Sequence, residues 1–319
     1  MSRKKKKYPR LLKIAVFAAG LLIAAELLLR FAVGFGEHPV YYSSGDYAYA
    51  LRPDQDLRRF GNRFFINEAG MRSAPLDTGE FRILKFGDSV LNGGVATDQD
   101  GLVSSLSEKR FAERPPLDPS GNPLPEKVRM LNVSAGSWGP DNAFAWMQAH
   151  GDFDARAIVL VFSSHDFRDI MTFEEVVGNV PFYPESQPFT ALTDAVTWTV
   201  SRYFTTVNWN DLPGAGVRPQ DTFNPGWEKF TYYCRNRDIP LLVYHHPTRS
   251  ECEAGEWNEE GTSLQSLFAE LGVAVISGLE VPCNASAYRD DIHPDEAGQA
   301  LIADALEPAL RRLIRDAAP

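Results

Sequence analysis

The sequence predicts an α/β protein whose body is a three-layer, doubly wound parallel sheet. Short apolar runs of strand length alternate with stretches of helical character from residue 81 onward. The run 157–162 is apolar without interruption, which is typical of a parallel strand covered on both faces. The first run, 81–86, ends at Gly87-Asp88-Ser89, so a serine stands at the carboxyl end of a strand, where open α/β sheets place their sites.

The elements of the body follow from apolar runs and their flanking turn residues. Five strands are expected, at 81–86, 128–133, 157–162, 240–244 and 273–277. Helices are expected at 101–112, 141–150 and 294–316. The long insertion 171–238 separates the third and fourth strands, and it contains predicted helices at 190–203 and 227–236 with a Pro/Gly-rich loop at 208–225. Insertions of this size above the carboxyl edge often shape a binding cleft.

The N-terminal forty residues differ from the rest. Residues 1–10 are basic and 11–35 are almost wholly apolar. As a helix, the apolar stretch spans roughly 37 Å, enough to cross the hydrocarbon core of a bilayer. Lysines before the span and few after it predict an N-in, C-out orientation. The competing interpretation is a cleaved signal peptide ending at Ala32-Val33-Gly34, but the apolar stretch is longer than a typical signal core, which favours an anchor.

The chain is therefore expected to be a single-pass protein of the inner membrane with its body on the periplasmic side. Its predicted segments are a basic N-terminus (1–10), a transmembrane helix or signal anchor (11–35), a β-rich extension (36–80) and the α/β body (81–319). The tyrosines of the extension are expected to pack on the core rather than to stack on sugars.

The charge distribution and the cysteine content limit which classes of protein this chain can belong to. Six positive charges in the first ten residues leave −16 for the remainder of a chain whose net charge is −10, which argues against nucleic acid as a partner. Three cysteines fit an exported protein. Cys252 and Cys283 are candidates for a disulfide that leaves Cys234 free, and buried unpaired thiols are the alternative.

Ser89 requires a base to act as a nucleophile, and the other end of the chain offers one. Asp290 and His293 stand three residues apart in a loop before the last predicted helix. A serine, a histidine that takes its proton and an aspartate that orients the histidine form a hydrolytic triad. The competing role for Ser89 is a helix N-cap, and the competing orienting residue is Asp291. The Asp–His pair favours catalysis, and the residues alone leave both aspartates as candidates for the orienting role.

Together these two stretches resemble the SGNH (GDSL-type) hydrolase family, in its membrane-anchored, exported bacterial form. Gly87-Asp88-Ser89 matches the first block of the family, and Asp290 with His293 matches its Asp-x-x-His block, followed by a glycine that opens the last helix. The resemblance covers residue 81 to the C-terminus. It implies a flavodoxin-like sheet, Ser89 as nucleophile, His293 as base, Asp290 as the orienting carboxylate, and no metal or organic cofactor.

The resemblance also implies three donors for the oxyanion of the tetrahedral intermediate. The first is the backbone N–H of Ser89. The second is a glycine N–H after the second strand, for which Gly136 is the nearest match and Gly139 the alternative. The third is an asparagine in a Gly-x-Asn-Asp block, which here reads Ser-Ser-His-Asp, so that His165 replaces the asparagine. Donation by His165 would depend on its tautomer and on pH, and capping of the strand is its alternative role.

For an exported protein, the resemblance implies a serine esterase that acts on short-chain esters, often O-acetyl esters, of a carbohydrate or cell-envelope substrate. An O-acetyltransferase that modifies an exopolysaccharide would use the same triad, with a sugar hydroxyl in place of water. A non-catalytic binding protein on the same fold is the third alternative, and only the altered block 163–165 supports it. The expected partners are an acylated glycan and the membrane.

Overall fold

The structure is a computed structural model of the chain and describes residues 9–124, 127–203, 216–281 and 283–317. At its centre is a five-stranded sheet in the order β11-β10-β7-β5-β6, in which every neighbouring pair is parallel. Its strands are β5 (Glu80–Gly87), β6 (Lys127–Ser134), β7 (Ala157–Ser163), β10 (Leu241–His246) and β11 (Ala274–Ser277). In chain order this is the 2-1-3-4-5 arrangement of flavodoxin-like folds, and its switch point lies between β5 and β7.

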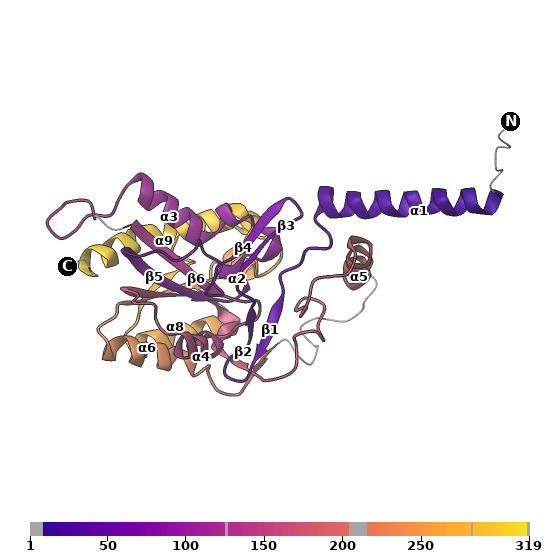
Figure 1. Cartoon of the computed structure of the whole chain (residues 1–319). Helices are drawn as coiled ribbons and strands as arrows, with labels where there is room; N and C mark the ends of the chain where they lie inside the picture. The colour runs from indigo at the N-terminus through magenta and orange to yellow at the C-terminus, as the bar shows by residue number, and fades with distance from the viewer. Residues whose placement is uncertain (1–8, 125–126, 204–215, 282, 318–319) are drawn as a thin grey trace.

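Helices cover both faces of the sheet, as Figure 1 shows. One face carries α3 (Val103–Glu113) and α9 (Glu296–Ala317), and the other carries α4 (Pro140–His150), α6 (Gly226–Asn236) and α8 (Glu259–Leu271). The predicted three-layer, doubly wound α/β fold is therefore confirmed. The two layers of core are separate clusters of buried side chains, one on each face of the sheet.

Strand β5 supplies both layers because its side chains alternate between the two faces. Ile83 packs in the layer of α3 and α9, whereas Leu84 and Phe86 pack in the layer of α4 and α6. Lys85 interrupts the apolar pattern and is fully buried, with its Nζ donating to Ser107 Oγ of α3 at 3.2 Å. Burial disfavours the charged ammonium and lowers the pKa of Lys85 to about 7.

The predicted strands and helices of the body are confirmed, with shifts of a few residues at their ends. Helix α5 (Ala191–Tyr203) is the first predicted helix of the insertion. The sequence analysis missed α7 (Arg249–Ala254), α8 and two short paired strands, β8 (Asp169–Met171) and β9 (Val217–Pro219). The predicted loop at 208–225 falls partly outside the described residues, and its described part includes β9.

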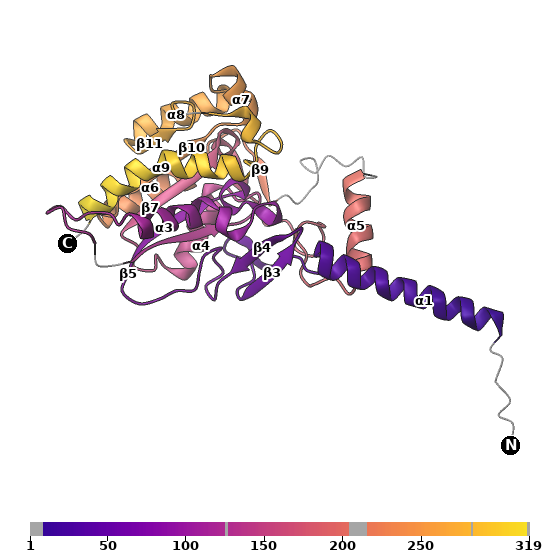
Figure 2. The same ribbon diagram turned by 90° about the horizontal axis from the view of Figure 1, so that it is seen from above.

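The N-terminal helix extends away from the body (Figures 1 and 2). It consists of α1 (Arg10–Leu28) and a π-helical turn, η1 (Leu29–Val33), and none of its residues is buried. The 24 residues from Arg10 to Val33 are long and apolar enough to cross a membrane, and a signal sequence passes the same test.

The segment between the N-terminal helix and the sheet forms two hairpins, which pair β1 (Tyr41–Ser44) with β2 (Ala48–Leu51) and β3 (Gln55–Arg59) with β4 (Asn62–Ile66). Tyr41, Tyr47 and Tyr49 are buried in the core cluster, as predicted for packing. The disulfide joins Cys252 to Cys283, and Cys234 is buried and free, which confirms the candidate pairing.

Candidate active site

Ser89 lies at the carboxyl end of β5, on the first residue of the short helix α2 (Ser89–Asn92). The turn is compact at Gly87, where an added Cβ would meet the Val161 carbonyl oxygen at 2.6 Å and the Leu91 Cβ at 2.7 Å. Only glycine fits between the strand and the helix there. Asp88, rather than Ser89, caps α2, because its Oδ1 accepts the Val90 N–H at 2.8 Å. The hydroxyl of Ser89 is therefore not needed for capping.

The structure brings Ser89, His293 and Asp290 together from opposite ends of the body. The Ser89 Oγ lies 2.9 Å from His293 Nε2, and His293 Nδ1 lies 2.8 Å from Asp290 Oδ2. An ionised carboxylate only accepts hydrogen bonds, so in the neutral imidazole Nδ1 carries the proton. Nε2 then presents its lone pair to the Ser89 hydroxyl. This is the geometry that proton transfer from serine to histidine requires.

The Asp290 carboxylate remains ionised in this arrangement. Its Oδ1 accepts the backbone N–H groups of Ile292 at 2.9 Å and His293 at 2.8 Å. Burial alone would raise the pKa of Asp290, but these two N–H donors and the imidazole outweigh burial and lower the pKa below its usual value. The side chains of His293 and Asp290 remain 39 % and 57 % exposed, so a substrate can reach them from solvent.

The loop that carries the Asp–His pair is tied to the start of α7. Asp291 Oδ1 accepts the Ser250 N–H at 3.0 Å and the Ser250 hydroxyl at 2.6 Å, and the Asp291 carbonyl accepts the Arg249 N–H at 2.6 Å. The Cys252–Cys283 disulfide links the same two segments covalently. Asp291, the alternative orienting residue, is thus used to hold the loop, and Asp290 is the aspartate that contacts the histidine.

His246, at the end of β10, also contacts the loop that carries Asp290 and His293. Its Nε2 lies 3.1 Å from the Ile292 carbonyl oxygen, and its ring stacks on Tyr288 with centroids 5.4 Å apart. Burial is the main cause that lowers the pKa of His246 to about 4, so the ring is neutral at pH 7 and its Nε2–H donates to the carbonyl. His246 therefore acts as a buried brace for the loop.

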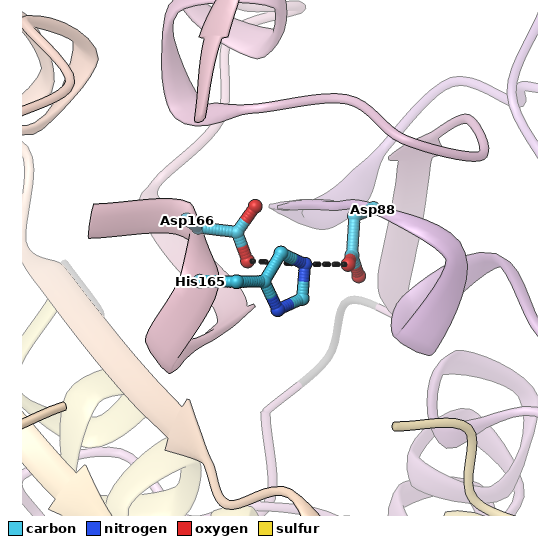
Figure 3. A group of neighbouring side chains, drawn as sticks. All are labelled: Asp88, His165 and Asp166. Carbon is cyan, nitrogen blue, oxygen red and sulfur yellow. Dashed lines mark ion pairs between the residues drawn. The ribbon is translucent and has the colours of Figure 1, made fainter. Parts of the chain in front are cut away.

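A second group of titratable side chains surrounds the residue before Ser89. His165 Nε2 lies 3.7 Å from Asp88 Oδ2 and 3.7 Å from Asp166 Oδ2, between the two carboxylates (Figure 3). Asp88 and Asp166 are almost completely buried, and His165 is 32 % exposed. Burial favours the neutral imidazole, but the negative charges of Asp166 and Asp88 outweigh it and raise the pKa of His165 to about 10. Burial also raises the pKa of Asp166 well above its usual value. The cluster as a whole therefore holds protons to higher pH than its separate groups would, which favours the imidazolium form of His165 at neutral pH.

Within the described residues, Asp88, His165 and Asp166 also form a group whose ligand atoms, all within 4.8 Å of one another, could hold a metal ion. Each carboxylate already accepts a backbone N–H, from Val90 for Asp88 and from Ser163 for Asp166. The imidazolium supplies the positive charge that these carboxylates need. The cluster is therefore best described as a buried ion-pair cluster that braces the loops after β5 and β7.

Gly136 follows β6, and its backbone is held by two tyrosines from outside the sheet. The Gly136 carbonyl accepts hydrogen bonds from Tyr49 Oη at 2.5 Å and from Tyr183 Oη at 3.3 Å. Tyr183 also contacts Ser137 Oγ at 3.1 Å, and Ser137 has a left-handed backbone with φ of 56°. This loop is held in a constrained conformation, as loops that present backbone donors often are.

Gly139, the alternative oxyanion glycine, has a different task. Its N–H donates to Asn142 Oδ1 at 3.0 Å in the cap of α4. An added Cβ at Gly139 would meet the Asp169 carbonyl oxygen at 2.5 Å, so packing explains the glycine. Of the two glycines, Gly136 is the better candidate for the oxyanion donor.

The sequence analysis missed the two tyrosines that hold the backbone of the Gly136 loop. Tyr49 comes from the β-rich extension and Tyr183 from the insertion, and both hydroxyls reach a loop distant in sequence. The insertion supplied the one available signal, since long segments above the carboxyl edge of a sheet commonly contribute to sites.

A scan against protein-family models and a search of curated proteins found no match for this chain. Among solved structures, the chain is similar to a lipase/acylhydrolase from Enterococcus faecalis, with 12 % identity, a TM-score of 0.41, and coverage of 72 % of this chain and 95 % of that one. It is similar to a two-domain esterase active on acetylated mannans, with 12 % identity and a TM-score of 0.42 over 76 % of this chain and 52 % of that one. A carbohydrate acetylesterase family member from Sinorhizobium meliloti matches at 14 % identity and a TM-score of 0.37, over 73 % of this chain and 98 % of that one. At such low identities and TM-scores, these similarities carry no argument about function, which has to be argued from the residues of the site.

Proposed function

We propose that this chain is a serine esterase of the SGNH type that hydrolyses short-chain esters, specifically O-acetyl esters of a carbohydrate or cell-envelope substrate. The observation that carries the proposal is the continuous hydrogen-bonded series from Ser89 Oγ through His293 to Asp290, with distances of 2.9 and 2.8 Å. A serine that only capped a helix would not need a histidine at its hydroxyl, and here Asp88 provides the cap.

The mechanism proceeds through an acyl-enzyme. Ser89 Oγ attacks the ester carbonyl carbon while His293 Nε2 takes the hydroxyl proton, and Asp290 stabilises the imidazolium. The tetrahedral intermediate collapses as His293 returns the proton to the departing alkoxide, which leaves as an alcohol. Water then attacks the acyl carbonyl carbon and gives a proton to His293. The second tetrahedral intermediate collapses as His293 passes that proton to Ser89 Oγ, which releases the acid and the free serine.

For the developing oxyanion we propose three donors, the backbone N–H groups of Ser89 and Gly136 and the Nδ1–H of His165. The Nε2 of His165 lies between two carboxylates, whereas its Nδ1 has no hydrogen-bond partner among the described residues. Mutations of such donors in hydrolases cost roughly 3–4 kcal/mol of barrier. His165 replaces the neutral asparagine amide of the family with a cation, and its charge is supported by Asp88 and Asp166. Because the pKa of His165 is about 10, its donation is constant across the neutral pH range.

We also propose that the N-terminal helix anchors the chain in the membrane, with the body on the extracytoplasmic side. The helix Arg10–Val33 is preceded by Lys4, Lys5, Lys6 and Lys7, which favour the cytoplasmic side. The disulfide between Cys252 and Cys283 fits an oxidising compartment. Both observations support an anchored enzyme of the periplasmic face.

The test of the substrate class uses the full-length chain in detergent with acetylated and deacetylated polysaccharide. Acetate release from the acetylated polymer by the parent chain, and its loss in Ser89→Ala and His293→Ala, is the expected result. Asp316→Asn, an exposed change at the end of α9, serves as the matched control. Transfer of acetyl groups to an added glycan without free acetate would assign the triad to a transferase instead. Hydrolysis of a small activated ester but no polysaccharide would exclude this substrate class.

A further inference from the structure

Helix α5 exposes an apolar face that the proposed chemistry does not use. Phe189, just before the helix, is 94 % exposed, and Val196, Val200 and Tyr203 are 62 %, 45 % and 67 % exposed. Val196 and Val200 stand one turn apart on α5, and Phe189 precedes the helix. Tyr203 is the last residue of α5, and its ring also packs against Trp198 with centroids 6.2 Å apart. These four exposed residues are called here the outer stripe of α5. Contiguous exposed apolar surface of this kind marks an interaction site on a folded protein.

The opposite face of α5 is fixed to the body, so the helix cannot turn its outer stripe inward. Asp194 forms a buried ion pair with Arg59 of β3 at 2.5 Å and accepts the Gly36 N–H at 2.7 Å. Trp198 packs against Phe35 and Phe60, with ring centroids 5.9 and 5.7 Å away. The inward face of α5 thus carries both Asp194 and Trp198, and the side exposed to solvent carries Val196 and Val200, so the helix is apolar on its outer side as well.

The start of α5 is bound to the N-terminal helix. Glu26 of α1 accepts the backbone N–H groups of Ala191 and Leu192, both at 2.9 Å, and pairs with Arg30 at 2.7 Å. A carboxylate at a helix N-terminus satisfies donors that the helix itself leaves open. Figures 1 and 2 agree that α5 lies crosswise to α1, close to the end of α1 that meets the body. A helix crosswise to a membrane span lies parallel to the membrane surface.

We propose that the outer stripe of α5 rests in the interfacial layer of the lipid bilayer, on the side where the body emerges. The inference rests on the proposed membrane anchor. Lipid is the occupant because α5 begins against α1 at Glu26. The apolar helix continues from there to Val33 and exposes Leu28 and Phe31 beside the start of α5. Phenylalanine, valine and a terminal tyrosine are side chains that interfacial helices bury.

Two contacts with the bilayer, α1 across it and α5 along it, fix the tilt of the body more firmly than a single span. The Arg59–Asp194 pair transmits this constraint to the β-rich extension, which in turn holds the Gly136 loop through Tyr49. The Ser89 site would then face a set direction relative to the membrane, which suits a polymer substrate held near the surface.

The test places a fluorescent probe on the outer stripe of the full-length chain in phospholipid nanodiscs. Val200→Cys is labelled with an environment-sensitive dye, and Val196→Cys serves as an independent second position. Val16→Cys reports on the membrane span, and Ser120→Cys, in an exposed loop of the body, reports on water. The unmodified chain provides the background, because Cys234 is buried and the other two cysteines are bonded.

Two quenchers separate the outcomes, nitroxide on the lipid acyl chains and iodide in water. We expect lipid nitroxide to quench the dye at positions 200 and 196, and iodide to quench it there at least about fivefold less than at position 120. Quenching by lipid at position 16 but by iodide at 200 and 196 would overturn the inference and leave the anchor intact. Protection of 200 and 196 from both quenchers would also overturn it, because protein would cover the stripe. Lack of lipid quenching at position 16 would refute both the membrane anchor and this inference. Ester hydrolysis, measured on the same samples, tests the catalytic triad independently of either.

Discussion

Replacing Asp166 with asparagine should bring the titration of His165 towards neutral pH. The His165 Nε2 lies 3.7 Å from Asp166 Oδ2. At an effective dielectric constant of about 20, two unit charges at this separation interact by about 4.5 kcal/mol. Solvent reaches 32 % of the His165 side chain. Screening then reduces the interaction by roughly half, so the pKa of His165 is expected to fall by about 1.5 to 2 in Asp166→Asn.

The shift has a defined consequence for both activity and stability. In the parent chain, the pKa of His165 is about 10, so the charged donor is present from pH 6 to 9. In Asp166→Asn, activity should decline between pH 7 and 9 as His165 loses its proton. The stability that His165 contributes is complete below the unfolded pKa of about 6.5 and disappears as pH rises through the folded pKa. The variant should lose that contribution at lower pH than the parent.

The assay is a pH titration of histidine ring signals by NMR on the full-length chain, labelled at the imidazole carbons. The spectrum of His165→Gln identifies the His165 signal by its disappearance, and Asp316→Asn is the charge-matched control. A His165 signal that titrates near pH 6.5 in the parent would refute the reasoning. So would a pKa of His165 that is the same in Asp166→Asn as in the parent.

Three further predictions follow from the same contacts. Asp290→Asn should lower kcat by roughly 10²–10⁴-fold with little change in KM, because the imidazole loses its orienting carboxylate; steady-state kinetics on a soluble acetyl ester test this, and unchanged kcat contradicts it. Burial lowers the pKa of Lys85 to about 7 from its ordinary value of 10.5, so its contribution to the free energy of unfolding rises with pH between these two values. In chemical denaturation, Lys85→Met should therefore raise the free energy of unfolding more at pH 6 than at pH 9. An equal increase at both pH values would contradict this prediction. Cys252 and Cys283 are 31 residues apart, and replacing both with serine should lower the free energy of unfolding by on the order of 3–4 kcal/mol. The same change should lower kcat, because the loop that carries Asp290 loses a covalent link. An unchanged denaturation curve and an unchanged kcat would show that hydrogen bonds alone hold this loop.

Much of the fold could be read from the sequence because its central strands are continuous apolar runs. Strand β7, for example, is buried at every position, and its apolar composition predicts a strand covered on both faces. The sequence analysis missed helix α8, although Leu264, Leu267, Phe268 and Leu271 recur at helical spacing and are buried. The three-residue strands β8 and β9 have no such pattern, because pairing between distant segments decides them.

The candidate site divides in the same way. Asp290 and His293 belong to one short block, so the resemblance to the family's Asp-x-x-His motif predicted which aspartate contacts the histidine. The position of His165 between two carboxylates depends on the meeting of loops after β5 and β7, and sequence alone left its charge open. The bonds from Tyr49 and Tyr183 to Gly136 join segments 87 and 47 residues apart, and no local pattern encodes them.

The most direct test of the proposed chemistry is labelling of the full-length chain with a serine-reactive phosphonate, followed by mass spectrometry of its peptides. The hydrogen bond between Ser89 Oγ and His293 Nε2 predicts that the phosphonate attaches to Ser89, that labelling is slower by orders of magnitude in His293→Ala, and that it is absent in Ser89→Ala. A folded parent chain that is not labelled, or is labelled equally in His293→Ala, would contradict the assignment of Ser89 as an activated nucleophile.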